Sequence, residues 1–171
     1  AAPRLAAARL RRLMERPSGL QFYPFQEPSV LITDAEQRIE AFARLVPEMG
    51  FAVIIGERLD APVNPVAFYR ETARLLERAG ASYIEVLNDA ADLYATDCML
   101  RAGFAPCAYF PALQRRGGAR RDQVVFSWSR EPFVPSKHPV PKEYAPFVDA
   151  YLEAHAASKP PSRDRQDTDR Q

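Results

Sequence analysis

The sequence predicts an α/β fold of three layers, with a mixed β-sheet and crossover helices. Two observations predict this class. From Val30 to Gly103, short apolar segments alternate with amphipathic helical segments, which is typical of strands joined by crossover helices. Two further apolar segments meet across Gly117-Gly118, and a short glycine turn of this kind joins antiparallel strands. We therefore expect a sheet that is partly parallel and partly antiparallel.

Composition supports one globular core with polar ends. The 171 residues are 47% hydrophobic and 11% aromatic, which is enough for a sizeable core. A net charge of +1 gives no global attraction to nucleic acid or membranes. We divide the chain into a basic amphipathic helix (1–19), an α/β core (20–130), a Pro-rich segment with a C-terminal helix (131–157) and a disordered tail (158–171). Because it begins Ala-Ala-Pro, we expect a processed chain or a piece of a longer polypeptide.

The N-terminal segment from Pro3 to Arg16 predicts a helix with apolar residues on one side and arginines on the other. Three interpretations stay open for it: a targeting peptide, an arm for a membrane surface or nucleic acid, and a docking helix with a solvated basic face. The aromatic stretch from Leu20 to Pro28 follows. We expect it to lie extended over the domain or to fill a groove.

The next segments predict a strand, a helix and a second strand. Val30-Leu31-Ile32 predicts a short buried strand, and Thr33-Asp34-Ala35-Glu36 fits a capping box that opens a helix. Apolar residues at helical spacing extend this helix to a stop near Pro47, and they are Ala35, Ile39, Phe42, Ala43 and Val46. Phe51 to Gly56 is apolar throughout and predicts a central strand.

The remaining elements carry clear boundary signals. Asn64-Pro65 fits an N-cap followed by proline in the first helical position, and Gly80 closes that helix. The segments that follow are a strand Tyr83 to Leu87, a helix Ala90 to Ala102, a strand Cys107 to Phe110, a strand Gln123 to Ser129 and a helix Lys142 to Ala157.

Two motifs resemble a known family. Val86-Leu87-Asn88-Asp89-Ala90-Ala91 is similar to the V-x-N-x-x-A that opens the last main helix of the GNAT acyltransferases, and Cys98 to Phe104 is similar to its L-Y-x-x-x-G-F close. An Asp before the second hairpin strand, Asp122, also fits. The stretch from Phe51 to Arg130 thus resembles the C-terminal half of a GNAT-type acyl-CoA N-acyltransferase. The resemblance implies transfer of an acyl group from coenzyme A to an amine.

The resemblance implies cofactor-binding roles for Asn88 and for the backbone amides of Val66, Ala67 and Phe68. Free amides at a helix N-terminus favour a phosphate group. However, the segment Leu59 to Val66 has no glycine, carries two prolines without an N–H, and contains an acidic residue. This is a departure from the glycine-rich phosphate loop of the family.

The resemblance also implies catalytic roles for Tyr94 and Glu85. The position of the family's proton-donating Tyr, counted back from Gly103, is occupied by Met99, which cannot act as an acid. Tyr94, counted forward from Asn88, lies near that position and could replace it; it fits a core aromatic equally well. Glu85, in the middle of a strand, lies either at a pocket or beside an arginine, and burial would raise its pKa toward that of a general base.

The predicted strand–helix–strand unit before the loop departs from the antiparallel strands of the family. We expect a missing half upstream, a related fold of different topology, or a homodimer or larger complex that completes the sheet. The alternative function is therefore a non-catalytic module for interaction or assembly. Acyl-CoA is the cofactor that the resemblance implies.

Other side chains predict no further chemistry. Cys98 and Cys107 fit neither a disulfide framework nor, with the distant His138 and His155, a metal site. Reduced cysteines and the lack of an apolar run of about 20 residues predict a cytoplasmic protein without a membrane span. The basic turn from Arg115 to Arg121 could grip phosphates or keep edge strands apart, and nucleic-acid binding is not favoured.

Overall fold

The computed structural model describes residues 3–14, 27–60, 62–116, 118–131 and 140–158. The expected roles of the aromatic stretch up to residue 26, of the Pro-rich residues 132–139 and of the tail at 159–171 lie outside the described residues. The elements are α1 (Pro3–Met14), β1 (Val30–Thr33), β2 (Ile39–Val46), η1 (Pro47–Met49), β3 (Phe51–Leu59), α2 (Pro65–Arg78), β4 (Tyr83–Asp89), α3 (Leu93–Ala102), β5 (Ala105–Arg116), β6 (Ala119–Ser129), η3 (Lys142–Tyr144) and α4 (Ala145–Ser158).

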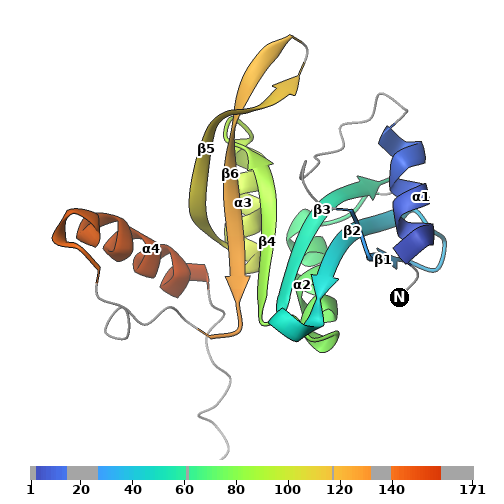
Figure 1. Ribbon diagram of the computed structural model, residues 1–171, viewed down its shortest axis with the longest axis horizontal. Coiled ribbons are helices and arrows are strands. Elements are labelled where there is room, and N and C mark those ends of the chain that lie inside the picture. Colours follow the sequence, from blue (N-terminus) through green and yellow to red (C-terminus); the bar gives the residue numbers. More distant parts are fainter. Residues whose placement is uncertain (1–2, 15–26, 61, 117, 132–139, 159–171) are drawn as a thin grey trace, which may run out of the picture.

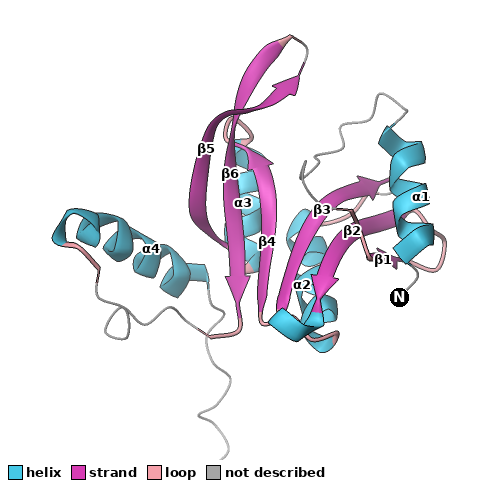
Figure 2. Cartoon of the chain, in the orientation of Figure 1, coloured by secondary structure: helices cyan, strands magenta, loops and turns pink. Residues whose placement is uncertain are grey.

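Six strands form one mixed sheet in the order β1-β2-β3-β4-β6-β5 (Figure 1). Strands β3 and β4 are parallel, and the other neighbouring pairs are antiparallel. Helices α2 and α3 cover one face, while α1 lies on the opposite face over β1 to β3 (Figure 2). The prediction of a three-layer mixed sheet is confirmed.

The predicted helix from Ala35 to Val46 is wrong, because this segment forms the hairpin of β1 and β2. The Asp34 carboxylate does not cap a helix. Its Oδ1 accepts hydrogen bonds from the amides of Arg38 (2.7 Å) and Ile39 (2.9 Å) in the turn, where Gln37 has a positive φ of 57°. The sheet therefore begins with three antiparallel strands, and the expected strand–helix–strand departure from the family disappears.

The physical reason for this error is that β2 is buried on both faces. Ala41 and Ala43 pack toward α2, whereas Phe42 packs under α1. A strand covered on both sides is apolar nearly throughout, so its pattern matches helical spacing as well as a strand.

The boundary signals of α2 are confirmed. The Asn64 side chain caps this helix, Pro65 occupies its first turn, and Gly80 follows its end with a φ of 110°. The helix predicted from Ala90 starts later, at Leu93. The Asp89 carboxylate accepts the Ala91 amide in the preceding turn, and Asp92 is the N-cap, whose carboxylate accepts the Ala95 amide. The antiparallel hairpin of β5 and β6 is also confirmed.

Helix α1 docks on the sheet through apolar and charged contacts. Ala6 and Leu10 are buried, and Leu10 packs with Phe42 in the cluster beneath the helix. Arg9 of α1 pairs with the buried carboxylate of Glu40, which also pairs with Arg58 of β3 at 2.9 Å. Of the three interpretations of this segment, the structure supports the docking helix.

Helix α4 lies beside the β5 edge, on the other side of the molecule from α1 (Figure 1). None of its described side chains is fully buried. We call the face of the sheet opposite α2 and α3 the front face. Over β1 to β3 this face is covered by α1, and beside β4, β6 and β5 it is bordered by α4.

Candidate functional site

The parallel pair of β3 and β4 opens into a fork. Pairing between β3 and β4 runs from Phe51 with Tyr83 to Ile54 with Val86. Beyond that point both strands continue, but they no longer pair with each other. A cavity of about 10 Å³ remains at the fork, and its lining includes Glu57 and Tyr69. This volume corresponds to about one water molecule. The fork is thus nearly filled by its own side chains.

A β-bulge turns Glu57 toward α2. In the β2–β3 register, Phe42 pairs with Gly56 and Ala43 pairs with Ile54, so Ile55 is the extra residue of the bulge. Glu57 consequently lies opposite Ala41, on the face that α2 covers. The bulge places a carboxylate inside the fork.

The Glu57 carboxyl group has an unusual proton affinity. Burial raises its pKa from the ordinary value of 4.5 to about 7, a hydrogen bond with Tyr69 partly opposes this shift, and the nearby charge of Asp92 adds to it. Burial and the Glu57 charge also raise the pKa of the Tyr69 hydroxyl, which stays protonated at neutral pH. Near neutral pH, Glu57 is therefore partly protonated, whereas Tyr69 keeps its proton.

The amides predicted to bind a cofactor already have acceptors. Asn64 Oδ1 accepts the N–H groups of Val66 at 3.0 Å and Ala67 at 3.3 Å, and the Asn64 carbonyl accepts the N–H group of Phe68 at 3.0 Å. The N-cap therefore occupies the donors that a phosphate group at this helix end would use. Their assignment as cofactor ligands stays a prediction.

Asn88, the fourth predicted cofactor ligand, is fully buried at the end of β4. Its Nδ2 group donates to the Asp92 carbonyl (3.3 Å) and to the Thr96 hydroxyl (3.2 Å). The amide of Asn88 thus joins β4 to the first turn of α3.

The structure does not bring the two predicted catalytic residues together. Tyr94 lies in the first turn of α3 and is 69% exposed, with its pKa raised chiefly by the neighbouring Cys98. Glu85 points to the opposite face of the sheet, since its neighbours Ile84 and Val86 pack toward α2 and α3. Met99, at the family's Tyr position, is fully buried core.

Glu57 and Tyr69 were missed by the sequence analysis. A signal was present, because Glu57 directly follows the apolar run Phe51 to Gly56 and is the first acidic residue of the chain after it. Its inward direction depends on the bulge at Ile55, which no sequence pattern marks. The tyrosine looks like any other apolar position of α2.

Two further features concern the described residues alone, namely metal-binding clusters and membrane-spanning helices. Within those ranges, no group of three or more His, Cys, Asp or Glu side chains could hold a metal ion. No helix there is long and apolar enough to cross a membrane. Cys98 and Cys107 are both free.

Comparison with solved structures identifies the fold. No family model matches the chain, and a search of curated proteins gives no significant match. Among solved structures, a candidate phosphinothricin N-acetyltransferase is similar, with 14% identity and a TM-score of 0.50 over 60% of this chain and 70% of its own. The ribosomal-protein-S18-alanine N-acetyltransferase from Escherichia coli is similar at 12% identity, with a TM-score of 0.50 over 64% of this chain and 70% of its own. The chain therefore has the fold of the GNAT-type N-acetyltransferases.

Proposed function

We propose that this chain is a GNAT-fold module that acts by binding other molecules, without acyl transfer at the fork of β3 and β4. The observation that carries the proposal is the N-cap of α2. Asn64 accepts hydrogen bonds from the amides of Val66 and Ala67, which occupy the helix end where a pyrophosphate would bind. A ligand there must first displace an intramolecular acceptor.

The volume and charge of the fork support the same proposal. Its cavity of about 10 Å³ holds about one water, so a pantetheine arm enters only if Glu57 and Tyr69 move. Asp60 lies in the loop just before α2 and is exposed, and its carboxylate repels phosphate groups despite the pairing with Arg58 at 3.1 Å. These features disfavour coenzyme A.

Binding of acetyl-CoA tests the proposal directly. We expect no rise in the unfolding midpoint of the wild-type protein at ~1 mM acetyl-CoA, because a ligand stabilises the folded state only when it exceeds its Kd. Inorganic pyrophosphate serves as a second probe of the helix end alone. Saturable acetyl-CoA binding in the micromolar range, measured by calorimetry, contradicts the proposal.

A matched variant locates any binding that is found. Asn64→Gly removes the capping oxygen and keeps a residue that is tolerated at an N-cap. If the cap blocks the site, pyrophosphate binds the variant more tightly than the wild type. Equal binding to both proteins shows that the Asn64 cap is not what excludes the anion.

An acyl-CoA N-acyltransferase is the second candidate, and the Glu57 carboxyl favours it. A pKa of about 7 suits a general base that accepts a proton from an ammonium group at neutral pH. Tyr94, whose pKa is raised, remains protonated and is able to supply a proton to a departing thiolate. Glu85 remains an alternative proton acceptor on the opposite face.

Kinetics separate this candidate from the binding module. An acetyl-CoA-dependent enzyme shows a rate that rises with pH through about 7, and Glu57→Gln removes that limb of the profile. Glu36→Gln, which removes an exposed carboxylate from the β1–β2 turn, is the matched control, and Glu85→Gln tests the alternative proton acceptor separately. No acylation of any amine in a panel of small amines and peptides eliminates this candidate.

Partners and location are part of the proposal. Strands β1 and β5 are the two edges of the sheet, and a second copy or a further part of a longer polypeptide is able to extend the sheet there. Both cysteines are free, which suits a reducing, cytoplasmic environment.

A further inference from the structure

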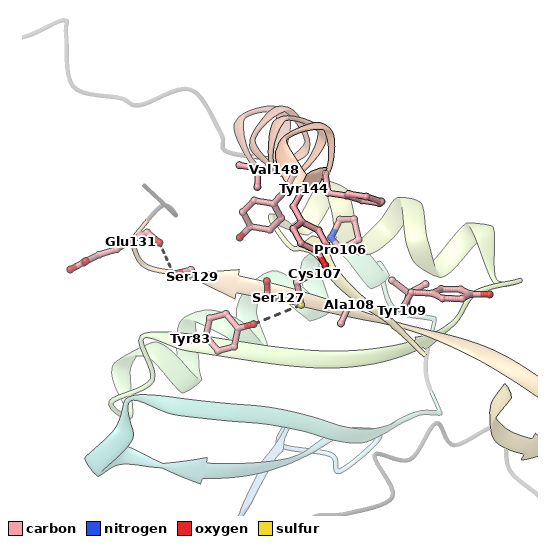
Figure 3. A pocket seen from close by; sticks show the side chains of 13 residues that line it. Tyr83, Pro106, Cys107, Ala108, Tyr109, Ser127, Ser129, Glu131, Tyr144 and Val148 are labelled. Carbon is pink, nitrogen blue, oxygen red and sulfur yellow. Dashed lines mark hydrogen bonds between the residues drawn. The ribbon is translucent and has the colours of Figure 1, made fainter. Parts of the chain in front are cut away.

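A large groove lies between α4 and the strands β4, β6 and β5 (Figure 3). Its volume is about 780 Å³, in contrast to the nearly filled fork. Small-molecule sites in proteins occupy about 300–1,000 Å³ and are mostly apolar, with a few polar groups that fix the ligand. The groove meets the size criterion, so its wall, floor and charge determine what it could hold.

Aromatic side chains form the wall of the groove. Tyr144 of η3 and Phe147 and Tyr151 of α4 line it. Tyr144 is 57% and Phe147 is 73% exposed, although aromatic residues of this size are usually covered in a monomer. A helix that presents rings to a groove and buries none of its described side chains is suited to contact a ligand.

Three neutral polar groups form the floor. The Tyr83 hydroxyl lies 3.7 Å from the Cys107 sulfur, and Ser127 lies beside them (Figure 3). Desolvation by burial is the main cause that raises the pKa of Tyr83 and of Cys107, so both are uncharged at neutral pH.

Ser127 is the unusual member of this floor. The residue is 2% exposed, and its Oγ atom makes no hydrogen bond of normal geometry in the described part of the chain. Its hydroxyl is nevertheless close enough to Tyr83 and Cys107 to oppose the rise in their pKa. A buried hydroxyl without a partner is costly and rare in folded proteins. Since Ser127 lines the groove, a ligand that reaches the floor is able to offer this hydroxyl a well-formed hydrogen bond.

The charge around the groove is negative. Glu85 lies directly opposite Ser127 in the β4–β6 register, and Glu131 lines the rim. No Lys or Arg lines the groove among the described residues, and no cation pairs with Glu85 there. A carboxylate beside aromatic rings attracts organic cations and repels anions.

We propose that this groove binds a small organic cation, an ammonium group on an aromatic or aliphatic body. The body lies against the rings of Tyr144 and Phe147, and the ammonium group lies at the floor between Glu85 and Ser127. This assignment goes beyond the proposed function and is independent of coenzyme A, because no residue of the fork lines the groove.

Three probes with the same ring and different charge test the proposal on the wild-type protein, without acyl-CoA. They are phenethylammonium, 2-phenylethanol and phenylacetate, and their affinities are measured by NMR titration of backbone amides. We expect the cation to bind about tenfold more tightly than the alcohol, and the anion least. Equal affinity for cation and alcohol, or no binding of the cation at ~10 mM, overturns the proposal.

Two variants assign the binding to this groove. Glu85→Gln is expected to abolish the preference for cation over alcohol and to leave alcohol binding unchanged. Glu36→Gln, which removes an exposed carboxylate from the β1–β2 turn, is the matched control and keeps the preference. A loss of preference in both variants, or in neither, overturns the assignment.

Ser127→Ala gives a readout that a merely structural role would not produce. The variant removes a buried hydroxyl that makes no hydrogen bond of normal geometry in the described part of the chain, so its unfolding midpoint is expected to stay close to that of the wild type. Its affinity for phenethylammonium is nevertheless expected to fall severalfold. An unchanged affinity contradicts the placement of the ammonium group at the floor.

Discussion

The two halves of the sheet differ in what covers their front faces. The half with β1, β2 and β3 is closed by α1, which buries Leu10 against Phe42 and pairs Arg9 with Glu40. The half with β4, β6 and β5 is bordered by α4 and keeps a groove of about 780 Å³. Both covering helices lie near a chain end, but only one of them is part of the core.

This difference shows how a fold used for catalysis can be divided between packing and binding. On the closed half, Leu10 of α1 packs with Phe42, Val53 and Ile55 in a buried cluster, and the cavity in the adjacent fork is only about 10 Å³. On the open half, the rings of Tyr144 and Phe147 are largely exposed, and the groove remains beside them. The contacts of the first half stabilise the fold, whereas the second half carries the groove in which we propose that a ligand binds.

The largest expected effect is on the buried ion pairs of the closed half. Glu40→Ala leaves Arg9 and Arg58 without their shared carboxylate, so we expect the free energy of unfolding to fall by about 3–5 kcal/mol. Urea denaturation measures this loss. Glu36→Ala, at an exposed site, is expected to cost less than about 0.5 kcal/mol. If the free energy of unfolding falls equally in Glu40→Ala and Glu36→Ala, the ion pairs of Glu40 do not stabilise the docking of α1.

A second comparison sets the two covering helices against each other. Leu10 is 3% exposed, and Leu10→Ala should cost about 2–4 kcal/mol through lost burial and a cavity. Phe147 is 73% exposed, and Phe147→Ala should cost less than about 0.5 kcal/mol. Chemical denaturation of both variants measures the two losses in the free energy of unfolding. If Phe147→Ala is as costly as Leu10→Ala, α4 is packed like α1 and the contrast between the halves is lost.

The third prediction concerns pH at the boundary between the halves. The pKa of Glu57 is raised from 4.5 to about 7 in the folded state, so the folded protein holds this proton more tightly than the unfolded chain. Its contribution to stability is complete below about 4.5 and is lost as pH rises through about 7, at a cost of about 1–3 kcal/mol.

Glu57→Gln isolates this contribution, because glutamine does not titrate. Urea denaturation at about pH 5 and about pH 8 should show a smaller fall in stability for the variant than for the wild type. The same fall in both proteins would show that Glu57 is not the group that couples pH to stability.

The smallest expected effect is at the N-cap of α2. Asn64→Ala removes the acceptor of two amides and should lower the free energy of unfolding by about 1 kcal/mol, while Asn64→Gly should cost a few tenths. Thermal denaturation of the two variants measures the difference. A cost near zero for Asn64→Ala would show that water replaces the cap, and that the helix end is open to an anion after all.

Local signals predicted much of the second half of the fold. Asn64-Pro65, the glycine at 80 and the Gly117-Gly118 turn act through their immediate neighbours, so the sequence predicts α2 and the β5–β6 hairpin correctly. The segment of β2 was mistaken for a helix, because burial on both faces removes the alternation that marks a strand. The candidate sites depend even more on context. The direction of Glu57 follows from a bulge, and the groove follows from where α4 lies.

The amino-acid sequence by itself determined the class of the fold, the position of most strands and helices, and the resemblance to the GNAT acyltransferases. These properties rest on hydrophobic periodicity and on turn and cap chemistry, which act over a few residues. Only the tertiary structure decided that the fork is filled, that Tyr94 and Glu85 lie on opposite sides of the sheet, and that an aromatic groove borders the open half. Such features depend on which distant segments pack together, and short-range patterns carry no information about that packing.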